Sequence, residues 1–356
     1  MRRKESMKKL AVIFGGMSTE HDVSIVSGSS VLANLDQTKY EIYPIYISKD
    51  GKWYFYEEEI SKIRVFQVGE EPDKLKPIQD IMQELQKMDV VFPVLHGLYG
   101  EDGTIQGLLE LLKIPYVGCK VLASSVSMDK VYTKIIFERA QIKQTPYCYI
   151  HKYGEEYEYI DRQMNHIKCK KQEILERIIH KLAFPMFVKP SNSGSSVGVT
   201  KANNEKELEE AISIAGKYDN KILVEQGIIG REVECAVLGN KEAKASCVGE
   251  IKSAEDFYSF DSKYKNSKSY TEIPANIGEH LAEEIRNLAV KAFQAVDGKG
   301  LARVDFFIEN STNEIYINEI NTMPGFTQIS MYPKLWEAVG VSYSKLLDEL
   351  IALAVE

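Results

Sequence analysis

The first part of the chain alternates continuous apolar runs with segments of helical periodicity. Apolar runs typical of buried strands occupy residues 8–16, 41–48 and 88–97. Residues 24–35 and 103–114 place apolar side chains three or four positions apart, as a helix with one buried face does. Strands that alternate with helices indicate βαβ units and a parallel sheet. Ligands bind beyond the carboxyl ends of such strands, so the pattern predicts a ligand site at that edge.

The rest of the chain mixes helices with strands suited to antiparallel pairing. Helical patterns cover residues 123–140, 205–218, 278–296 and 342–355. Strand patterns cover residues 184–190, 221–228, 231–239, 244–252, 301–309 and 314–321. The tyrosine-rich stretch between them has no clear period, and we expect residues 153–172 to form a surface excursion. A chain of 356 residues is longer than one core supports, and we predict three α/β domains at 1–120, 121–225 and 226–356.

Composition and charge narrow the class of protein. The chain is 44% hydrophobic and 27% charged, which is ordinary for a globular protein, and its apolar runs are too short to span a membrane. The net charge of −8 argues against binding to the phosphates of nucleic acids. The opening "MRRKESMKKL" and the short apolar run after it do not resemble a secretory signal, so we expect a cytoplasmic protein without a membrane partner.

The cysteines and histidines form no metal-binding motif in the sequence. Five cysteines are scattered without any C-x-x-C spacing, so we expect reduced thiols rather than a metal site. His151, His166 and Cys169 fall in or beside the predicted excursion without regular spacing, which favours a solvated segment over a metal site.

A loop of small polar residues follows the strand at 184–190. Lys189 lies at the end of this strand and "PSNSGSSVG" comes next, with glycines that let backbone N–H groups converge on an anion. The lysine precedes the glycines, unlike in a Walker A motif, so an ordinary hairpin turn is an equal alternative for this loop alone. A second lysine, Lys130, opens a helix upstream. Two lysines and a glycine-rich loop together predict a nucleotide triphosphate site.

The strands at 301–309 and 314–321 carry polar side chains on one predicted face. A three-residue turn between them would place Asp305 opposite Glu319 and Arg303 opposite Asn321. The other face would be apolar except for Asn318, and would contain Val304, Phe306, Ile308, Tyr316 and Ile320. A four-residue turn would separate Asp305 from Glu319, so this prediction depends on the register.

These oxygen ligands have two possible roles. Two carboxylates and a carboxamide on a mostly apolar hairpin suit Mg²⁺, which bridges substrate phosphates. The alternative is an exposed polar face in which Arg303 pairs with the carboxylates. The rigid Pro-Gly turn in "NTMPGF", directly after Asn321, favours a substrate site.

Polar residues in three loops are further candidates. Glu20 and His96 follow the ends of predicted parallel strands, with helix caps or simple loop residues as the alternative. "EDG" at residues 101–103 could cap the helix that begins near Thr104. The polar loop at 256–274 is long enough to be a lid, and Lys263 and Tyr264 are its chemical candidates, a packed tyrosine being the alternative.

Six motifs in order resemble the D-alanine–D-alanine ligases of the ATP-grasp superfamily, and the resemblance covers nearly the whole chain. They are "GGMSTEHDVS", "LHGLYGEDGTIQGLLE", "SMDK", "VKPSNSGSSVG", "FYSFDSKY" and "NEINTMPGFTQISMYP". The resemblance implies a three-domain ATP-grasp fold with an N-terminal Rossmann-like parallel sheet and two α+β domains that sandwich ATP. It implies an ATP-dependent ligase for peptidoglycan precursors that works through an acyl phosphate, and commonly a homodimer.

The resemblance also implies roles for individual residues. ATP would be bound by Lys130, Lys189, Ser195, Ser196, Val197, Glu225, Gln226, Gly227, Ile228 and Glu232. Two Mg²⁺ ions, or Mn²⁺ in their place, would be bound by Asp305, Glu319 and Asn321. The catalytic set would be Glu20, Ser195, Tyr264, Arg303 and Gly325, with Arg303 and the Gly325 N–H on the tetrahedral intermediate. The amino acids would be bound by Glu20, His96, Lys263, Ser330 and Met331.

The second substrate is the open point within this family. Lactate-using relatives lack the lid tyrosine, which is present here as Tyr264. Serine-using relatives tend to have a polar residue where Met331 stands, so we expect D-alanine, with D-serine as the alternative. Two alternative functions lie outside the family. Glu20 and Tyr264 argue against an ATP-grasp carboxylase. The intact set of lysines and carboxylates argues against a non-catalytic nucleotide sensor.

Overall fold

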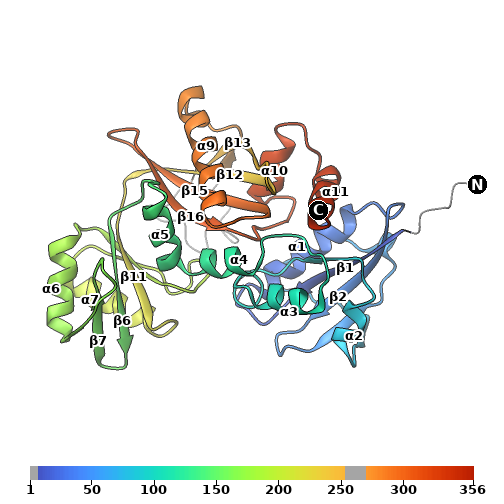
Figure 1. Cartoon of the computed structure of the whole chain (residues 1–356), viewed down its shortest axis with the longest axis horizontal. Coiled ribbons are helices and arrows are strands. Elements are labelled where there is room, and N and C mark those ends of the chain that lie inside the picture. The colour runs from blue at the N-terminus through green and yellow to red at the C-terminus, as the bar shows by residue number, and fades with distance from the viewer. Residues whose placement is uncertain (1–6, 253–269) are drawn as a thin grey trace, which may run out of the picture.

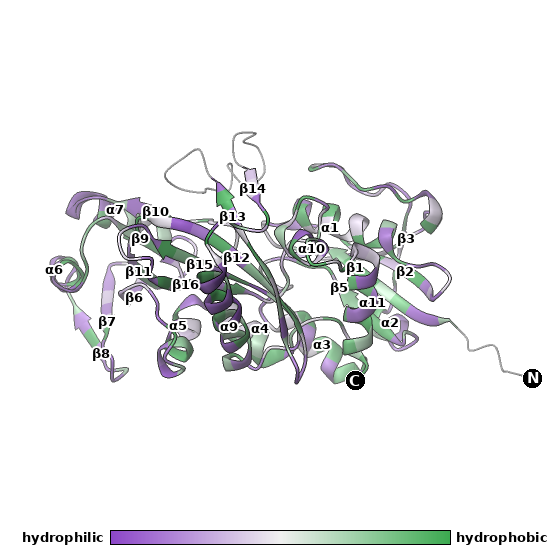
Figure 2. Ribbon diagram, turned by 90° about the horizontal axis from the view of Figure 1, so that it is seen from above, coloured by the Kyte–Doolittle hydropathy of each residue, from purple (hydrophilic) through white to green (hydrophobic). Residues whose placement is uncertain are grey.

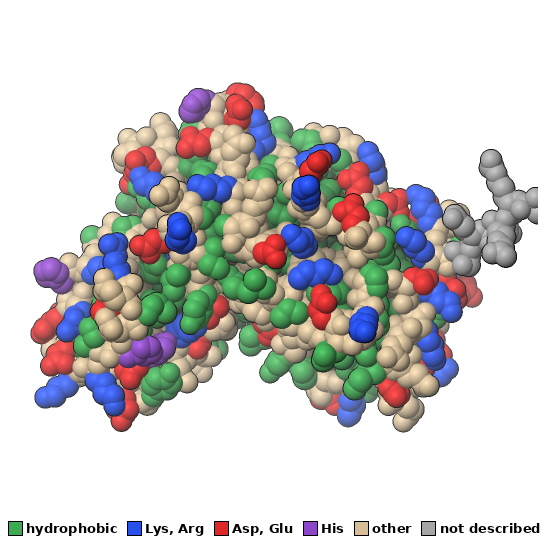
Figure 3. Space-filling model, in the orientation of Figure 1, with side chains coloured by type: hydrophobic (Ala, Val, Ile, Leu, Met, Phe, Trp, Pro, Cys, Tyr) green, Lys and Arg blue, Asp and Glu red, His purple; other side chains and the backbone are tan. Residues whose placement is uncertain are grey.

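The computed structural model describes residues 7–252 and 270–356, in which the chain forms three β-sheets flanked by helices (Figure 1). Hydrophobic residues are concentrated in the strands at the centre of the molecule (Figure 2). On the face drawn in Figure 3, acidic and basic side chains are interspersed over the surface. Lys263 and Tyr264 lie outside the described residues. The division into domains at residues 120 and 225 stays a prediction.

The first sheet has the order β4-β3-β2-β1-β5. The central strands β2 and β1 and the edge strand β5 are parallel, as predicted. Its strands are β1 (Lys8–Gly15), β2 (Tyr40–Ile47), β3 (Trp53–Tyr56), β4 (Leu75–Pro77) and β5 (Val90–Pro93). The helical elements of this part are α1 (His21–Asn34), η1 (Ile60–Lys62), α2 (Ile81–Leu85) and α3 (Thr104–Leu112). The short strands β3 and β4 add an antiparallel edge that the apolar pattern did not show.

Strand β1 is apolar from Leu10 to Phe14 because both faces of the sheet are covered there. Leu10, Val12 and Phe14 pack into one core cluster, while Ala11 and Ile13 point into another. Helix α1 lies close to β1 because Gly28 has no side chain at the contact; a Cβ there would overlap the Cβ of Phe14. This close packing places the start of α1, next to Glu20, at the carboxyl end of β1.

The second sheet is antiparallel with the order β10-β9-β11-β6-β7-β8. Its strands are β6 (Tyr147–Tyr153), β7 (Glu156–Ile160), β8 (His166–Cys169), β9 (Met186–Pro190), β10 (Thr200–Ala202) and β11 (Lys221–Gln226). Helices α6 (Lys171–Lys181) and α7 (Glu205–Ala215) cover one face, and α4 (Val121–Met128) and α5 (Lys130–Arg139) precede the sheet. The prediction of a surface excursion at 153–172 was wrong. The Gly154 turn connects β6 to β7, and β8 follows. Tyr157 and Tyr159 of β7 pack in the same core cluster as the buried residues of α6.

The third sheet is also antiparallel, with the order β14-β13-β12-β15-β16. Its strands are β12 (Gly230–Gly239), β13 (Lys244–Lys252), β14 (Tyr270–Glu272), β15 (Gly300–Glu309) and β16 (Ile315–Asn321). Helix α9 (Glu279–Ala295) packs on one face, and α10 (Met331–Glu337) and α11 (Tyr343–Ala354) pack on the other.

The last two helices join the third sheet to the first. One core cluster contains Leu10 and Phe14 of β1 together with Tyr332, Trp336 and Leu346 of the C-terminal helices. Figure 1 shows α11 beside α1 and the edge of the first sheet. The face of the first sheet that meets α1 is therefore completed by the opposite end of the chain.

Candidate active site

A small cavity between the second and third sheets collects charged residues from four elements of the chain. Its lining residues are Ser127, Lys130, Thr133, Lys134, Lys189, Leu223, Glu225, Asn318 and Glu319. Lysines come from α5 and β9, and carboxylates come from β11 and β16. The fold therefore brings both predicted phosphate lysines to the same space as Glu319.

Glu225 binds two lysines within this cavity. Its carboxylate lies 2.6 Å from the Lys134 ammonium and 2.6 Å from the Lys189 ammonium, and it accepts a hydrogen bond from Thr145 Oγ1 at 3.0 Å. Burial alone would raise the pKa of Glu225, but the two lysines outweigh it and hold this pKa well below its usual range. Lys134 was missed by the sequence analysis. It lies four residues after Lys130, one helical turn along α5, which was the available signal.

Lys130 contacts the loop of small polar residues after Lys189, residues 190–198, which we call the Ser-Gly loop. The Lys130 ammonium donates to the Ser193 carbonyl at 2.5 Å. Ser193 Oγ donates to the Val197 carbonyl at 2.9 Å, and the backbone of Ser195 and Ser196 takes the left-handed conformation, with φ of 49° and 59°. Positive φ is uncommon for residues with a side chain, so these two serines hold a conformation that their surroundings must maintain.

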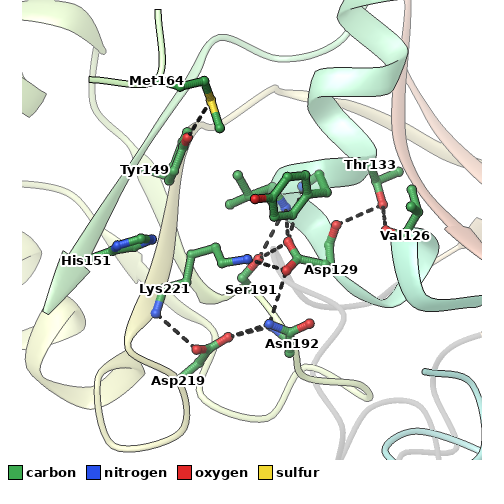
Figure 4. Close-up of polar contacts among 12 residues, drawn as sticks. Val126, Asp129, Thr133, Tyr149, His151, Met164, Ser191, Asn192, Asp219 and Lys221 are labelled. Carbon is green, nitrogen blue, oxygen red and sulfur yellow. Dashed lines mark hydrogen bonds and ion pairs between the residues drawn. The ribbon is translucent and has the colours of Figure 1, made fainter. Parts of the chain in front are cut away.

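Asp129 anchors this loop and was not predicted (Figure 4). It is the N-cap of α5, where Oδ1 accepts from the N–H groups of Val131 and Tyr132, both at 3.1 Å. The same oxygen accepts from Ser191 Oγ at 2.6 Å, and the other oxygen pairs with the Lys221 ammonium. Burial opposes ionisation of Asp129, but Lys221 and Ser191 prevail and lower its pKa. One carboxylate thus joins the start of α5, the start of the loop and β11.

Glu20 meets the loop from the first sheet. It precedes α1, is buried, and its Oε1 accepts a hydrogen bond from the Ser195 hydroxyl. The backbone of Gly97 passes so close that a Cβ there would lie 2.6 Å from Glu20 Oε2, and Gly194 of the loop approaches the same carboxylate even more closely. The structure therefore brings together Glu20 and Ser195 of the predicted catalytic set.

His96 is buried with both ring nitrogens in contact with polar partners. Nδ1 lies 3.0 Å from the Met323 carbonyl and Nε2 lies 2.9 Å from Ser27 Oγ. Burial lowers the pKa of His96, which favours the neutral ring. The histidine links the first sheet to the turn that follows β16.

Glu101 makes a similar link and was missed because "EDG" was interpreted only as a helix cap. The cap contact belongs to Asp102, which accepts from the Thr104 N–H at 3.0 Å. Glu101 instead accepts from the N–H of Gly97 at 2.8 Å and of Met323 at 3.3 Å. Burial, together with the nearby Glu20, raises the pKa of Glu101 to about 8.

The hairpin of β15 and β16 has the predicted register near the site but not the predicted turn. Asp305 lies opposite Glu319 and Arg303 lies opposite Asn321. Nearer the turn, however, Phe306 pairs with Ile317 and Ile308 pairs with Ile315, and the Glu309 N–H bonds the Glu314 carbonyl. The turn thus has four residues, and a β-bulge at Asn318 restores the pairing that a four-residue turn alone would have lost.

The bulge also changes which side chains face the core. Ile315 and Ile317 are buried in the cluster under α9, where Tyr316 had been expected. Asn318 lines the cavity next to Glu319 instead of facing the apolar side. The predicted composition of the apolar face was wrong for these positions, because the extra residue shifts the alternation by one.

The polar face of this hairpin is not fully exposed, because Asp305 is buried and Arg303, Glu319 and Asn321 are half-buried. Arg303 forms a two-pronged contact with Asp305, at 2.7 Å for both N–H···O distances, and lies 3.0 Å from Glu234 of β12. Asn321 donates to Asp305 at 3.1 Å. Burial would lower the pKa of Arg303, but Asp305 and Glu234 raise it well above its usual value. Asp305, Glu319 and Asn321 form an oxygen donor set that fits Mg²⁺.

The turn after β16 carries the remaining predicted residues. Gly325 lies against Ser330, where a Cβ would be 2.8 Å from Ser330 Oγ, and that hydroxyl accepts from the Thr327 N–H at 3.0 Å. Ser330 is the N-cap position of α10. Met331 begins α10 and is buried in the core, with its methyl group against Gly249.

The predicted ATP-binding residues at the end of β11 lie beside the cavity. Gln226 ends β11 and its Oε1 accepts from the Ala183 N–H at 3.0 Å, while the Gly227 N–H donates to the Pro185 carbonyl at 2.7 Å. Ile228 continues to β12, which contains Glu232. These contacts fix the backbone that connects the second and third sheets.

The fold and this site define the class of protein. Lysines of α5 and β9 meet Glu319 of the third sheet in this cavity, and two solved ligases share the ATP-grasp fold. A D-Ala:D-Ser ligase of Enterococcus faecalis, VanG, superposes with a TM-score of 0.84 at 38% identity, covering 98% of this chain and 100% of that one. A D-alanine–D-alanine ligase of Coxiella burnetii gives 0.81 at 35% identity, covering 98% and 94%.

Sequence comparison gives the family. The D-ala D-ala ligase N-terminus family matches residues 9–119, and the D-ala D-ala ligase C-terminus family matches residues 155–352. The D-alanine–D-alanine ligase of Clostridium acetobutylicum is 51% identical over 347 residues, covering 98% of each chain. That of Acetivibrio thermocellus is 48% identical over 98% of this chain and 96% of its own. The chain belongs to the D-alanine–D-alanine ligase family of ATP-dependent ligases. Within the described residues, no helix is long and apolar enough to cross a membrane.

Proposed function

We propose that the protein joins two D-alanines into D-alanyl-D-alanine, converting ATP to ADP and phosphate, to supply a peptidoglycan precursor. The observation that carries this proposal is the cavity in which Lys130, Lys189 and Glu319 meet between two sheets. The carboxylate of the first D-alanine would attack the γ-phosphorus, and ADP would leave. The amine of the second would attack the acyl phosphate carbon, lose a proton and displace phosphate.

The lysines and the loop would hold the ATP phosphates. Glu225 fixes the Lys189 ammonium in position, and Asp129 fixes the start of the helix that carries Lys130. Catalysis would then come from positioning and from neutralisation of charge on the transferred group. The segment Gln226–Gly227–Ile228 would meet the adenine and Glu232 the ribose. We assign Glu225 a positioning role toward the lysines in addition to its predicted place in this ATP set.

The amino-acid side would be built around Glu20. Its carboxylate, with His96 and Ser195, would bind the ammonium of the first D-alanine, and Tyr264 would complete the hydrogen-bonded set. The contact between Ser195 and Glu20 couples this substrate to the phosphate loop, so closure of the loop would also exclude water from the acyl phosphate. Arg303 and the N–H of Gly325 would stabilise the oxyanion of the tetrahedral intermediate.

Asp305, Glu319 and Asn321 would hold Mg²⁺. When bound, two Mg²⁺ ions, or Mn²⁺ in their place, neutralise the negative charge on the phosphates. Arg303 already orients the Asp305 carboxylate through two hydrogen bonds. Glu234, which was not predicted, shares Arg303 with Asp305 and would set the position of that guanidinium.

D-alanine is the second substrate that the relatives favour. The curated relatives in the range of 46% to 51% identity bear the name D-alanine–D-alanine ligase. The serine-using VanG structure is more distant, at 38%. Lys263, Ser330 and the start of α10 would bind its carboxylate. Met331 is buried in the core, so it would not contact the second substrate directly. It would instead influence the shape of the pocket that binds this substrate.

Product analysis tests the function directly. The purified protein is incubated with ATP, Mg²⁺ and D-alanine, with or without equimolar D-serine or D-lactate, and products are identified by mass. We expect D-alanyl-D-alanine as the main product in every mixture. A dominant mixed product would make the protein a ligase of the resistance type. Binding of ATP without any product would refute ligation.

The family resemblance also supports a homodimer, and the need for ATP supports a cytoplasmic location. Light scattering of the purified protein measures the first, and a mass of one chain at micromolar concentration would contradict it. Fractionation of cells measures the second.

A further inference from the structure

Three adjacent strands at the edge of the second sheet each present one metal-binding side chain. His151 lies on β6, Glu158 on β7 and His166 on β8. The register places His151 directly opposite Glu158, while His166 lies opposite Ile160, two residues along from the partner of Glu158. Facing residues and their i, i+2 neighbours share one side of a sheet, so all three side chains point to the same face.

The donor atoms of these residues converge. Glu158 Oε2 lies 2.9 Å from His166 Nδ1 and 3.9 Å from His151 Nδ1, and the two imidazole rings are 5.3 Å apart. Two ligands at the usual 2.0–2.1 Å from a tetrahedral Zn²⁺ are about 3.3 Å apart. The observed separations bracket that value. Within residues 7–252 and 270–356, this is the one group of three His, Cys, Asp or Glu residues whose ligand atoms all lie within 4.8 Å of one another.

The surroundings hold the donors in place and leave one side open. The side chains of His151 and Glu158 are 16% and 21% exposed, and that of His166 is 52% exposed. Tyr149 and Tyr153 pack beside the His151 ring, at centroid distances of 6.3 Å and 5.8 Å. His151 is thus supported by packing, and solvent can reach His166.

Neighbouring positive charge is largely accounted for. Lys221 is the register partner of His151, but Figure 4 shows its side chain extending away from His151 toward Asp129, with which it forms an ion pair. Lys168, the register partner of Glu158, is exposed and has a long side chain that solvent can accommodate. The carboxylate of Glu158 lies 2.9 Å from the His166 ring nitrogen and 3.9 Å from that of His151, so it faces both imidazoles.

We propose that His151, Glu158 and His166 form a binding site for a divalent transition metal of the Zn²⁺ class, with water as the fourth ligand. Two imidazoles and one carboxylate suit such an ion, whereas Mg²⁺ and Ca²⁺ take oxygen ligands. The sequence favoured a solvated segment here over a metal site, and the group weighed then contained Cys169 in place of Glu158. Cys169 is three residues after His166 and packs toward the core on the opposite face.

The site would serve as a structural link. Strand β8 has four residues, lies at the edge of the sheet and carries alternately exposed side chains, so few apolar contacts hold it. An ion shared by three strands would tie β8, and the helix α6 that follows it, to β6. The ion would replace the proton between His166 Nδ1 and the Glu158 carboxylate. This role is independent of ATP and of the proposed ligation.

Metal titration tests the proposal. Metal-free protein with reduced thiols is titrated with Zn²⁺ against a chromophoric chelator, in excess Mg²⁺ to occupy sites made of oxygen ligands. We expect a Zn²⁺ site in the wild type whose affinity falls at least tenfold in His151→Ala, His166→Ala and Glu158→Gln. The controls are His280→Ala, on the exposed face of α9, and Cys169→Ser, and both should bind Zn²⁺ as the wild type does.

Two further readouts separate a true site from incidental binding. With Cu²⁺ as the probe, the electron paramagnetic resonance spectrum should show two coupled imidazole nitrogens in the wild type and one in each histidine variant. Zn²⁺ should raise the Tm of the wild type and of both controls, but not of the three ligand variants, whose metal-free circular dichroism spectra should match the wild type. Equal Zn²⁺ affinity in the ligand variants and the controls would overturn the proposal, as would a Cu²⁺ spectrum that the histidine substitutions leave unchanged.

Discussion

At the scale of single residues, the site depends on carboxylates that sit among opposite charges. Glu225, Asp129 and Asp305 are each buried and paired with at least one cation. A buried charge that has lost its partner is strongly unfavourable, whereas an exposed ion pair contributes little. The contribution of each pair can therefore be measured against an exposed pair of the same kind.

We predict that Glu225→Gln destabilises the protein by about 3–5 kcal/mol, because Lys134 and Lys189 then share no carboxylate. Urea unfolding measures this loss. The control is Glu314→Gln, which breaks the exposed pair with Lys143 and should cost at most about 1 kcal/mol.

The same variant has a defined pH dependence. The pKa of Glu225 is depressed in the folded state, so its stabilisation is present above the unfolded value near 4.5 and is lost as the pH falls through the folded value. The difference in stability between wild type and Glu225→Gln should therefore shrink only below about pH 4.5. A difference that stays constant down to acid unfolding would contradict the ion-paired state.

The contribution of Glu101 to stability should change with pH in the direction opposite to that of Glu225, falling as the pH rises. Its pKa is raised to about 8, so the folded state binds the proton more tightly than the unfolded chain does. Stability from this group is complete below the ordinary carboxyl pKa near 4.5 and is lost as the pH rises through about 8. Relative to Glu101→Gln, the wild type should lose at most about 1.4 kcal/mol per pH unit in this window. Parallel stability curves for the two proteins would show that Glu101 stays ionised.

At the scale of elements, the Ser-Gly loop is held at its start and at its middle. Asp129 fixes its start, and Ser195 reaches Glu20 across the site. The approach of Gly194 to the Glu20 carboxylate leaves no room for a side chain. A side chain at 194 would therefore force the Glu20 carboxylate or the loop to shift.

We predict that Gly194→Ala lowers kcat/KM for ligation at least tenfold while leaving the Tm within a few degrees of the wild type. The added Cβ would collide with Glu20 and keep the loop from docking. Gly107→Ala is the matched control, because that glycine lies in helix α3 with nothing within 4 Å of an added Cβ. It should retain full activity and gain about 0.5–1 kcal/mol in stability. Normal activity of Gly194→Ala would show that the loop does not need to approach Glu20.

At the scale of the whole molecule, the first sheet depends on the last helix. Leu346 of α11 is fully buried in the cluster that also contains Leu10 and Phe14 of β1. The ring of Phe92 on β5 packs against Phe326, in the turn after β16, with centroids 5.8 Å apart. The two ends of the chain thus share one core.

We predict that Leu346→Ala costs about 2–5 kcal/mol and weakens hydrogen-exchange protection in β1 as well as in α11. Leu111→Ala, whose side chain is 84% exposed on α3, is the control and should change stability by less than about 0.5 kcal/mol. Protection lost in α11 alone would mean that the first sheet is stable without the C-terminal helix.

The hairpin of β15 and β16 illustrates how far local pattern reaches. Alternation of apolar and polar residues was enough to put Asp305, Glu319, Arg303 and Asn321 on one face. The turn length could not be obtained this way, because the Asn318 bulge offsets the fourth turn residue. The predicted pairing was therefore correct although the three-residue turn from which it was inferred was wrong.

The amino-acid sequence by itself determined the order of most elements, the parallel start of the first sheet, the loop after Lys189 and the family, because these depend on local periodicity and contiguous motifs. Tertiary structure alone decided the contacts between distant segments. It placed Glu225 between two lysines, joined Asp129 to Ser191 and Lys221, and brought Glu101 to Met323. It also turned the irregular segment at 153–172 into strands that align His151, Glu158 and His166. Such contacts depend on how sheets pair and pack, and no local pattern in the chain encodes that.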